Sequence, residues 1–139
     1  MSIVERIDRD INVAVITVSD TRTVETDKGG RLVQEYLADI NTVIDEDNYK
    51  IVKDDAASIT KAVSAMLDKG VDAVITTGGT GIAKRDVTIE AVRPFFDKEI
   101  EGFGEIFRML SYTEDIGSRS ILSRAVAGTH ANQIIISMP

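Results

Sequence analysis

Short apolar runs rich in β-branched residues alternate along this chain with segments in which apolar residues recur at helical spacing. The runs are predicted to be strands and cover residues 11–18, 49–54, 71–76 and 133–137. The predicted helices are residues 31–40, a stretch from Ile59 to a stop at Gly70, and residues 103–112. Because parallel neighbours need crossover connections, this order predicts an α/β fold in which helices cover both faces of a parallel sheet.

The chain has 139 residues, which is enough to bury a core, and a single domain over residues 1–139 is expected. The small-residue segment 118–129 is expected to lead into the last strand. In sheets of this kind, ligands bind beyond the carboxyl ends of the strands. The segments that follow those ends, 19–30, 54–56, 77–88 and residue 139, are therefore expected to meet at one edge.

Charge and composition limit the partners. A formal net charge of −7 leaves no general basic surface for nucleic acid or anionic lipid, so an anionic ligand must be held by local donors. The absence of cysteine excludes disulfides, thiolate nucleophiles and cysteine-based zinc sites. No apolar run approaches membrane-spanning length, and residues 1–10 lack the apolar core of a signal peptide. A soluble cytoplasmic protein is expected.

A glycine-rich loop, Thr77–Gly81, follows the third predicted strand directly. It is not a P-loop, because Ile82 and Ala83 stand where Lys and Ser or Thr are required, and Lys84 replaces the third glycine of a dinucleotide fingerprint. Its glycines lack a Cβ, so they still let the backbone reach positive φ. Consecutive N–H groups in a turn of that kind bind anions. Thr77 and Thr80 would add hydroxyl donors. The alternative is a tight strand-to-helix turn without a ligand.

An Arg85–Asp86 pair follows the glycine loop, and Thr88 is predicted to be the N-cap of the next helix. A carboxylate beside a phosphate-binding turn is unfavourable unless a cation lies between them. Mg²⁺ is the natural candidate, because it is bound by one or two carboxylates together with phosphate oxygens. The alternative for Arg85 and Asp86 is a solvent-exposed ion pair, but the neighbouring glycines favour the functional interpretation.

The stretch TTGGTGIAKRDVTIEA (76–91) resembles, almost residue for residue, the signature of the MoaB/Mog family of molybdenum-cofactor biosynthesis proteins. Further similarities follow the family's order along nearly the whole chain, and EIEGFGE (99–105) is most similar to the B branch. They are TVSDTR (17–22), DKGG (27–30), VKDD (52–55), EIEGFGEIFRMLS (99–111), ILSRAVAGT (121–129) and SMP (137–139).

This resemblance implies a three-layer α/β/α sandwich with a mostly parallel sheet, and assembly into a homotrimer or hexamer. It implies binding of molybdopterin, a pterin that carries a dithiolene and a terminal phosphate. Some family members adenylate that phosphate with Mg-ATP, and their important acids match Asp54 and Asp86, which would be catalytic and hold Mg²⁺. Together with the glycine loop, the substrate- and phosphate-binding residues would be Ser19, Asp20, Asp27, Lys28, Gly29, Thr77, Gly78, Gly79, Thr80, Gly81, Arg85, Ser123 and Arg124.

Two departures from the family pattern stand out. Ile89 replaces a frequent proline, which weakens helix pre-organisation only slightly. The family also continues past the position of Pro139 with a glycine-led loop and a covering helix, so the domain is expected to lack both.

Three functions remain open at this point. The first is a molybdopterin adenylyltransferase that uses Mg-ATP, and the pair Asp54 and Asp86 favours it. The second is a non-catalytic molybdopterin-binding protein of the same pathway. The third, an unrelated nucleotide- or sugar-phosphate-binding protein, is disfavoured by the length of the resemblance.

Overall fold

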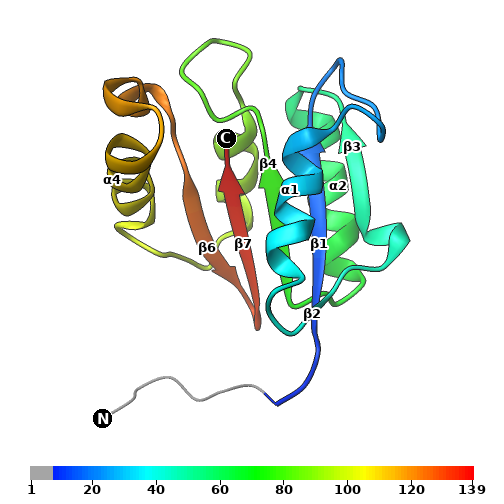
Figure 1. Ribbon diagram of the computed structural model, residues 1–139. Coiled ribbons are helices and arrows are strands. Elements are labelled where there is room, and N and C mark those ends of the chain that lie inside the picture. Colours follow the sequence, from blue (N-terminus) through cyan, green and yellow to red (C-terminus); the bar gives the residue numbers. More distant parts are fainter. Residues whose placement is uncertain (1–7) are drawn as a thin grey trace.

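The computed structural model describes residues 8–139, and residues 1–7, most of the stretch inspected for a signal peptide, lie outside this range. Seven strands form one sheet, six of them in the order β2-β1-β4-β7-β6-β5 (Figure 1). The seventh, β3, also pairs with β1, further along that strand than β2 does. The strands are β1 Ile11–Val18, β2 Thr42–Val43, β3 Tyr49–Val52, β4 Ala73–Thr77, β5 Lys98–Glu99, β6 Val126–His130 and β7 Gln133–Met138. The helices are α1 Lys28–Leu37, α2 Ala56–Asp68, α3 Thr88–Val92 and α4 Phe103–Glu114, with short 3-10 turns at Glu46–Asn48, Arg93–Phe95 and Gly117–Leu122.

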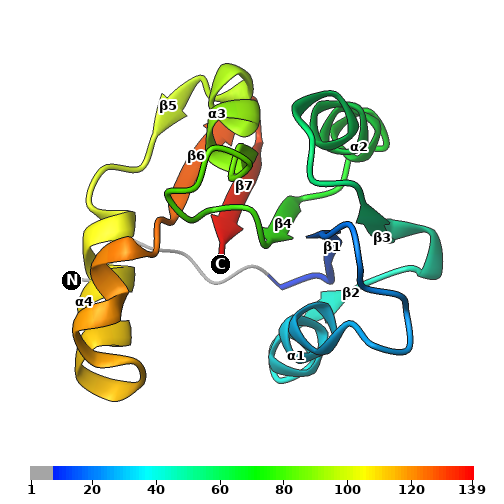
Figure 2. The same ribbon diagram turned by 90° about the horizontal axis from the view of Figure 1, so that it is seen from above.

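Helices lie on both sides of the sheet, as predicted. In Figure 2, α2 and α3 cover one face, while α1 and α4 lie on the other side. Alternate residues of β1 serve the two faces, since Ala14 and Ile16 belong to the core under α2 and α3, and Val13 and Val15 to the core under α1. The predicted α/β architecture with a mostly parallel sheet is therefore confirmed. Within the described range, no helix is both long and apolar enough to cross a membrane.

The edge formed by β5 and β6 was not predicted. β6 runs antiparallel to β7, and Ala131 turns the chain between them with a φ of 52°. The small residues of this segment have low strand propensity, which hides the strand in the sequence. Gly128 is required by packing, because a Cβ there would lie 2.3 Å from the Phe96 ring. The segment 118–129 is thus partly a strand.

The apolar face of α4 is left largely uncovered in this chain. Ile106, Met109, Leu110 and Tyr112 are all exposed, and no residue of α4 is buried. The contiguous apolar surface agrees with the predicted association of copies into a trimer or hexamer, which stays a prediction.

Candidate functional site

The carboxyl ends of four mutually parallel strands, β3, β1, β4 and β7, meet at one edge of the sheet. Backbone hydrogen bonds join the loops that leave them. The Ser19 N–H donates to the carbonyl of Val52 at 2.9 Å, and the Gly78 N–H donates to the carbonyl of Met138 at 2.9 Å. The predicted clustering of these loops is confirmed, and it brings the glycine loop next to the segments after β1 and β3.

Two glycines of this loop adopt positive φ, 98° at Gly78 and 68° at Gly79. A Cβ at position 78 would lie 2.5 Å from the carbonyl oxygen of Val18, and one at position 79 would lie 2.2 Å from Oγ1 of Thr88. Side chains are thus excluded both by backbone conformation and by space. The glycines hold the loop close against β1 and the start of α3.

Thr88 anchors this loop and is not the N-cap that the sequence predicted. Val87 precedes the helix at the capping position, and its side chain makes no capping hydrogen bond. Thr88 is fully buried. Its hydroxyl donates to the carbonyl of Gly78 at 3.0 Å, and its N–H donates to the carbonyl of Gly79 at 3.0 Å. The hydrogen bonds that Thr88 makes with the glycine loop in the folded structure outweigh the local preference of threonine for the N-cap position.

Asp54 has the most unusual environment at this edge. Its Oδ1 is buried without a hydrogen-bond partner among the described residues. The same atom would lie 3.2 Å from a Cβ at Gly79, so the carboxylate borders the glycine loop. Burial raises the pKa of Asp54, and the negative charges of Asp20 and Asp86 raise it further. An unpaired buried carboxylate oxygen is costly, which makes it a candidate ligand for a cation.

Asp86 lies on the other side of the same loop. Its Oδ2 accepts a hydrogen bond from the Ala83 N–H at 3.0 Å and would lie 2.7 Å from a Cβ at Gly81. Asp20 is tied to Asp54, because its Oδ1 accepts from the Asp54 N–H at 2.9 Å. Over residues 8–139 no group of three or more acidic or histidine side chains could by itself hold a metal. Asp54 and Asp86 therefore fit Mg²⁺ only if ligand oxygens complete the shell.

Arg124 clamps the glycine loop from the β6 side. Its Nε donates to the carbonyls of Thr80 and Gly81, both at 2.9 Å, and one terminal nitrogen donates to the Asp86 carbonyl at 3.2 Å. The terminal nitrogens also bind both carboxylate oxygens of Glu90 at 2.9 and 3.0 Å. Sequence reasoning missed Glu90, because nothing local to a residue 34 positions away indicates this pairing. With its donors used here, Arg124 chiefly fixes the loop.

Asp27 is buried at the start of α1, and its hydrogen bonds fix the side chains and backbone next to the candidate site. It accepts hydrogen bonds from the hydroxyls of Thr17, at 2.6 Å, and Tyr49, and from the Gly30 N–H at 3.0 Å. Burial alone would raise the pKa of Asp27, but these donors hold it below its ordinary value. The capped helix begins at Lys28, three residues earlier than predicted, because the side chain of Asp27 compensates for two glycines in the first turn.

The remaining predicted site residues differ in whether their polar groups are available to bind a ligand. Lys28, Gly29 and Arg85 are exposed, and Ser123 is half-buried next to Arg124. Ser19 caps its own loop, since its Oγ accepts from the N–H groups of Thr21 and Arg22 at 3.2 and 3.0 Å. The Thr77 hydroxyl donates to the carbonyl of Pro139 at 2.9 Å.

Replacing Asp54 with asparagine should stabilise the ligand-free protein at neutral pH. Because the folded-state pKa is raised, the proton favours the folded state, and this contribution is lost as the pH rises through that pKa. The amide of asparagine is neutral at every pH, so the variant avoids this loss of stability. We expect a higher Tm for Asp54→Asn at pH 7, and a difference that shrinks as the pH falls to about 4, where the unfolded carboxyl also protonates.

The neighbouring residue supplies the matched control. Asp55 caps α2, with its carboxylate accepting from the N–H and hydroxyl of Ser58 at 2.7 and 2.9 Å, and these bonds lower its pKa. Asp55→Asn should therefore lower the Tm at pH 7. Thermal melts of both variants at two pH values test this, and a lower Tm for Asp54→Asn at pH 7 would contradict the assigned environment.

Comparison with known proteins agrees with this geometry. Residues 14–139 match the family described as "Probable molybdopterin binding domain". The chain is 62% identical over 134 residues to molybdenum cofactor biosynthesis protein B of Staphylococcus carnosus (strain TM300), covering 96% of this chain and 79% of that one. It superposes on a crystal structure of a molybdenum cofactor biosynthesis protein B with a TM-score of 0.89 and 52% identity, covering 96% of this chain and 83% of the other. The tungsten cofactor synthesizing protein MoaB from Pyrococcus furiosus matches with a TM-score of 0.79 and 40% identity, covering 93% and 81%.

Proposed function

The chain belongs to the MoaB/Mog family of molybdopterin-binding proteins that act in molybdenum cofactor biosynthesis, and from this membership we propose that it adenylates the terminal phosphate of molybdopterin with Mg-ATP. The observation that carries the proposal is the pair of carboxylates on either side of the glycine loop. One of them, Asp54, has a buried oxygen without a partner among the described residues. A site for a phosphate alone has no need of two acids, whereas a site for phosphate and a cation does.

Adenylation is phosphoryl transfer at the α-phosphorus of ATP. An oxygen of the molybdopterin phosphate forms a bond to that phosphorus, the bond to the bridging oxygen of the β-phosphate breaks, and pyrophosphate leaves. The attacking phosphate is already anionic at neutral pH, so no strong base is needed. The task of the protein is to bring two anionic groups together, which requires positioning and charge neutralisation.

The residues of this edge match that task. Asp54 and Asp86 would hold Mg²⁺, which when bound neutralises phosphate charge between them. The backbone N–H groups of the loop Gly78–Gly81 would hold a phosphate in the conformation that Arg124 and Thr88 fix. Lys84 and Arg85 are exposed at the rim and can offset the remaining charge.

The raised pKa of Asp54 links the protonation of this carboxylate to ligand binding. A cation binds the ionised carboxylate, so binding of Mg²⁺ and a phosphate ligand would release any proton that Asp54 carries. The positive charge of Mg²⁺ held by Asp54 and Asp86 would offset the repulsion among Asp20, Asp54 and Asp86 that raises this pKa.

A molybdopterin-binding protein without catalytic activity is the second candidate. It is favoured by Arg124, whose donors are taken up by the loop carbonyls and by Glu90 and are therefore not free to offset phosphate charge. Such a protein would use the same glycine loop to carry molybdopterin to another enzyme.

One incubation separates the two candidates. The protein is mixed with molybdopterin and ATP, with Mg²⁺ or with EDTA, and adenylated molybdopterin and pyrophosphate are quantified after chromatography. We expect product only with Mg²⁺. Stoichiometric molybdopterin binding without product would leave the carrier function, and the absence of both binding and product would contradict the proposal altogether.

A further inference from the structure

The outer edge of β3 and the adjoining face of α2 form a groove, here called the β3 groove, that the candidate site does not use. β3 pairs with β1 on one side, and no strand among the described residues pairs with its other side. Both Figure 1 and Figure 2 show α2 beside β3. The groove has a volume of about 490 Å³. It is lined by residues 50–53 and by one face of the helix, Ser58, Lys61, Ala62, Ala65 and Met66.

The backbone of β3 is open for pairing on this outer side. In a parallel ladder the N–H and C=O of one residue point to the same neighbouring strand, and successive residues alternate between the two sides. Val52 faces β1, since its carbonyl accepts a hydrogen bond from the Ser19 N–H at 2.9 Å. Ile51 therefore directs its N–H and C=O away from β1. Groups of this kind on an edge strand are the ones that an added strand binds.

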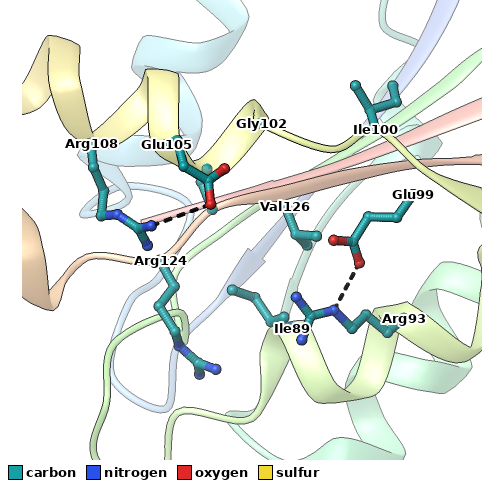
Figure 3. Close-up of a pocket in the computed structure, with 11 residues that line it drawn as sticks. Ile89, Arg93, Glu99, Ile100, Gly102, Glu105, Arg108, Arg124 and Val126 are labelled. Carbon is teal, nitrogen blue, oxygen red and sulfur yellow. Dashed lines mark hydrogen bonds and ion pairs between the residues drawn. The ribbon is translucent and has the colours of Figure 1, made fainter.

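The charged residues of the β3 groove are all positive. Lys50, Lys53 and Lys61 line it, and the lining contains no acidic residue from the described part of the chain. The ion pairs formed among the described residues involve none of these lysines. The cavity between α3 and α4 differs, because its arginines pair with the carboxylates of Glu99 and Glu105 (Figure 3). In a chain with a net charge of −7, the β3 groove is thus a local positive surface.

The floor of the β3 groove is apolar. Val52 and Ala62 pack against the core under α2 and α3, and Met66 belongs to that core. Lysines on an edge strand can serve only to prevent edge-to-edge association, but that role does not require an apolar floor beside them. Two copies of this edge would also bring lysine against lysine, which disfavours pairing of β3 with a second copy of itself. The groove is therefore complementary to a partner that is both acidic and partly apolar.

We propose that the β3 groove binds an acidic, extended segment of another protein by strand addition. The backbone of the segment pairs with the outer edge of β3 at Ile51, its apolar side chains contact Ala62 and Met66, and its carboxylates contact Lys50 and Lys61. Because β3 leads into Asp54 two residues after its end, the bound protein lies beside the candidate site. This interaction goes beyond the proposed adenylation and does not depend on it.

The probe is an acetylated and amidated heptapeptide in which Glu and Val alternate. It is titrated into the isotope-labelled protein and followed by NMR, without molybdopterin or ATP, so the result is independent of the proposed function. We expect saturable shifts and slower hydrogen exchange at the Ile51 amide, because this N–H gains a partner. Added salt should weaken binding, since exposed charges are screened.

Reversing two lysines tests the charge complementarity. Lys50→Glu/Lys61→Glu should bind the probe about tenfold more weakly, because two attractions between exposed charges become repulsions. A heptapeptide in which Lys and Val alternate should in turn bind this variant more tightly than it binds the wild type. The matched control, Lys98→Glu/Arg119→Glu, changes the net charge equally at exposed positions outside the groove and should bind the probe like the wild type.

Several results would overturn the proposal. Equal binding of heptaglutamate would show attraction of any polyanion, and tighter binding of a single-stranded oligonucleotide would assign the groove to nucleic acid. An equal loss in the control variant, or binding that leaves the Ile51 amide unchanged, would exclude strand addition at this edge. No binding up to the solubility limit of the peptide would leave the lysines as protection of the edge. A shift of the Ile51 amide with protein concentration alone would assign the edge to a second copy of this chain.

Discussion

Asp86→Asn should reduce formation of adenylated molybdopterin by at least about a hundredfold, the size of effect seen when one charge-stabilising group is removed from an active site. The amide keeps the volume of the carboxylate, and its oxygen can still accept from the Ala83 N–H, which donates at 3.0 Å in the wild type. The loop should therefore fold as before. What is lost is the negative charge that would hold Mg²⁺ between the phosphates.

Asp68→Asn is the control for this experiment, since it removes the same charge at an exposed position at the end of α2, away from the loop edge. Product is quantified by chromatography at matched, saturating molybdopterin, and the fold is checked by thermal melting. Wild-type turnover by Asp86→Asn would remove this residue from the metal site. A loss of turnover together with a lower Tm would point to loop damage instead.

Gly79→Ala should cost about 2–5 kcal/mol of unfolding free energy, because it combines a left-handed backbone with a steric clash. The residue has a φ of 68°, and the new Cβ would lie 2.2 Å from Oγ1 of Thr88. That hydroxyl is fully buried and holds the Gly78 carbonyl, so it cannot move aside without breaking the anchor of the loop. Binding of molybdopterin should weaken together with stability.

Gly70→Ala isolates the backbone contribution. Gly70 has a φ of 79°, but a Cβ there would meet nothing within 4 Å. This variant should lose only about 1 kcal/mol, the cost of a left-handed alanine. Urea denaturation of both variants measures the difference, and equal losses would show that Thr88 and the glycine loop are not packed as described.

Much of the architecture could be predicted from the local pattern. The β-branched runs of β1 and β4 are buried on both faces and flanked by helix-periodic segments, which is enough to predict a parallel sheet. β6 escaped prediction because Ala127 and Gly128 have the composition of a loop. They form a strand only because β7 lies beside them and the Phe96 ring packs against Gly128.

For the candidate site, too, some features follow from the sequence and others only from the tertiary structure. The order of strands and helices required that the segments with Asp54, Gly79 and Asp86 reach one edge of the sheet, so the sequence by itself determined which residues assemble there. Only the tertiary structure decided what each does. Thr88 supports the loop instead of capping a helix, Asp27 is buried under hydroxyl donors, and Arg124 is held by Glu90 from another element. Periodicity is a property of neighbouring residues, whereas burial and hydrogen-bond partners depend on contacts between residues that lie far apart in the chain.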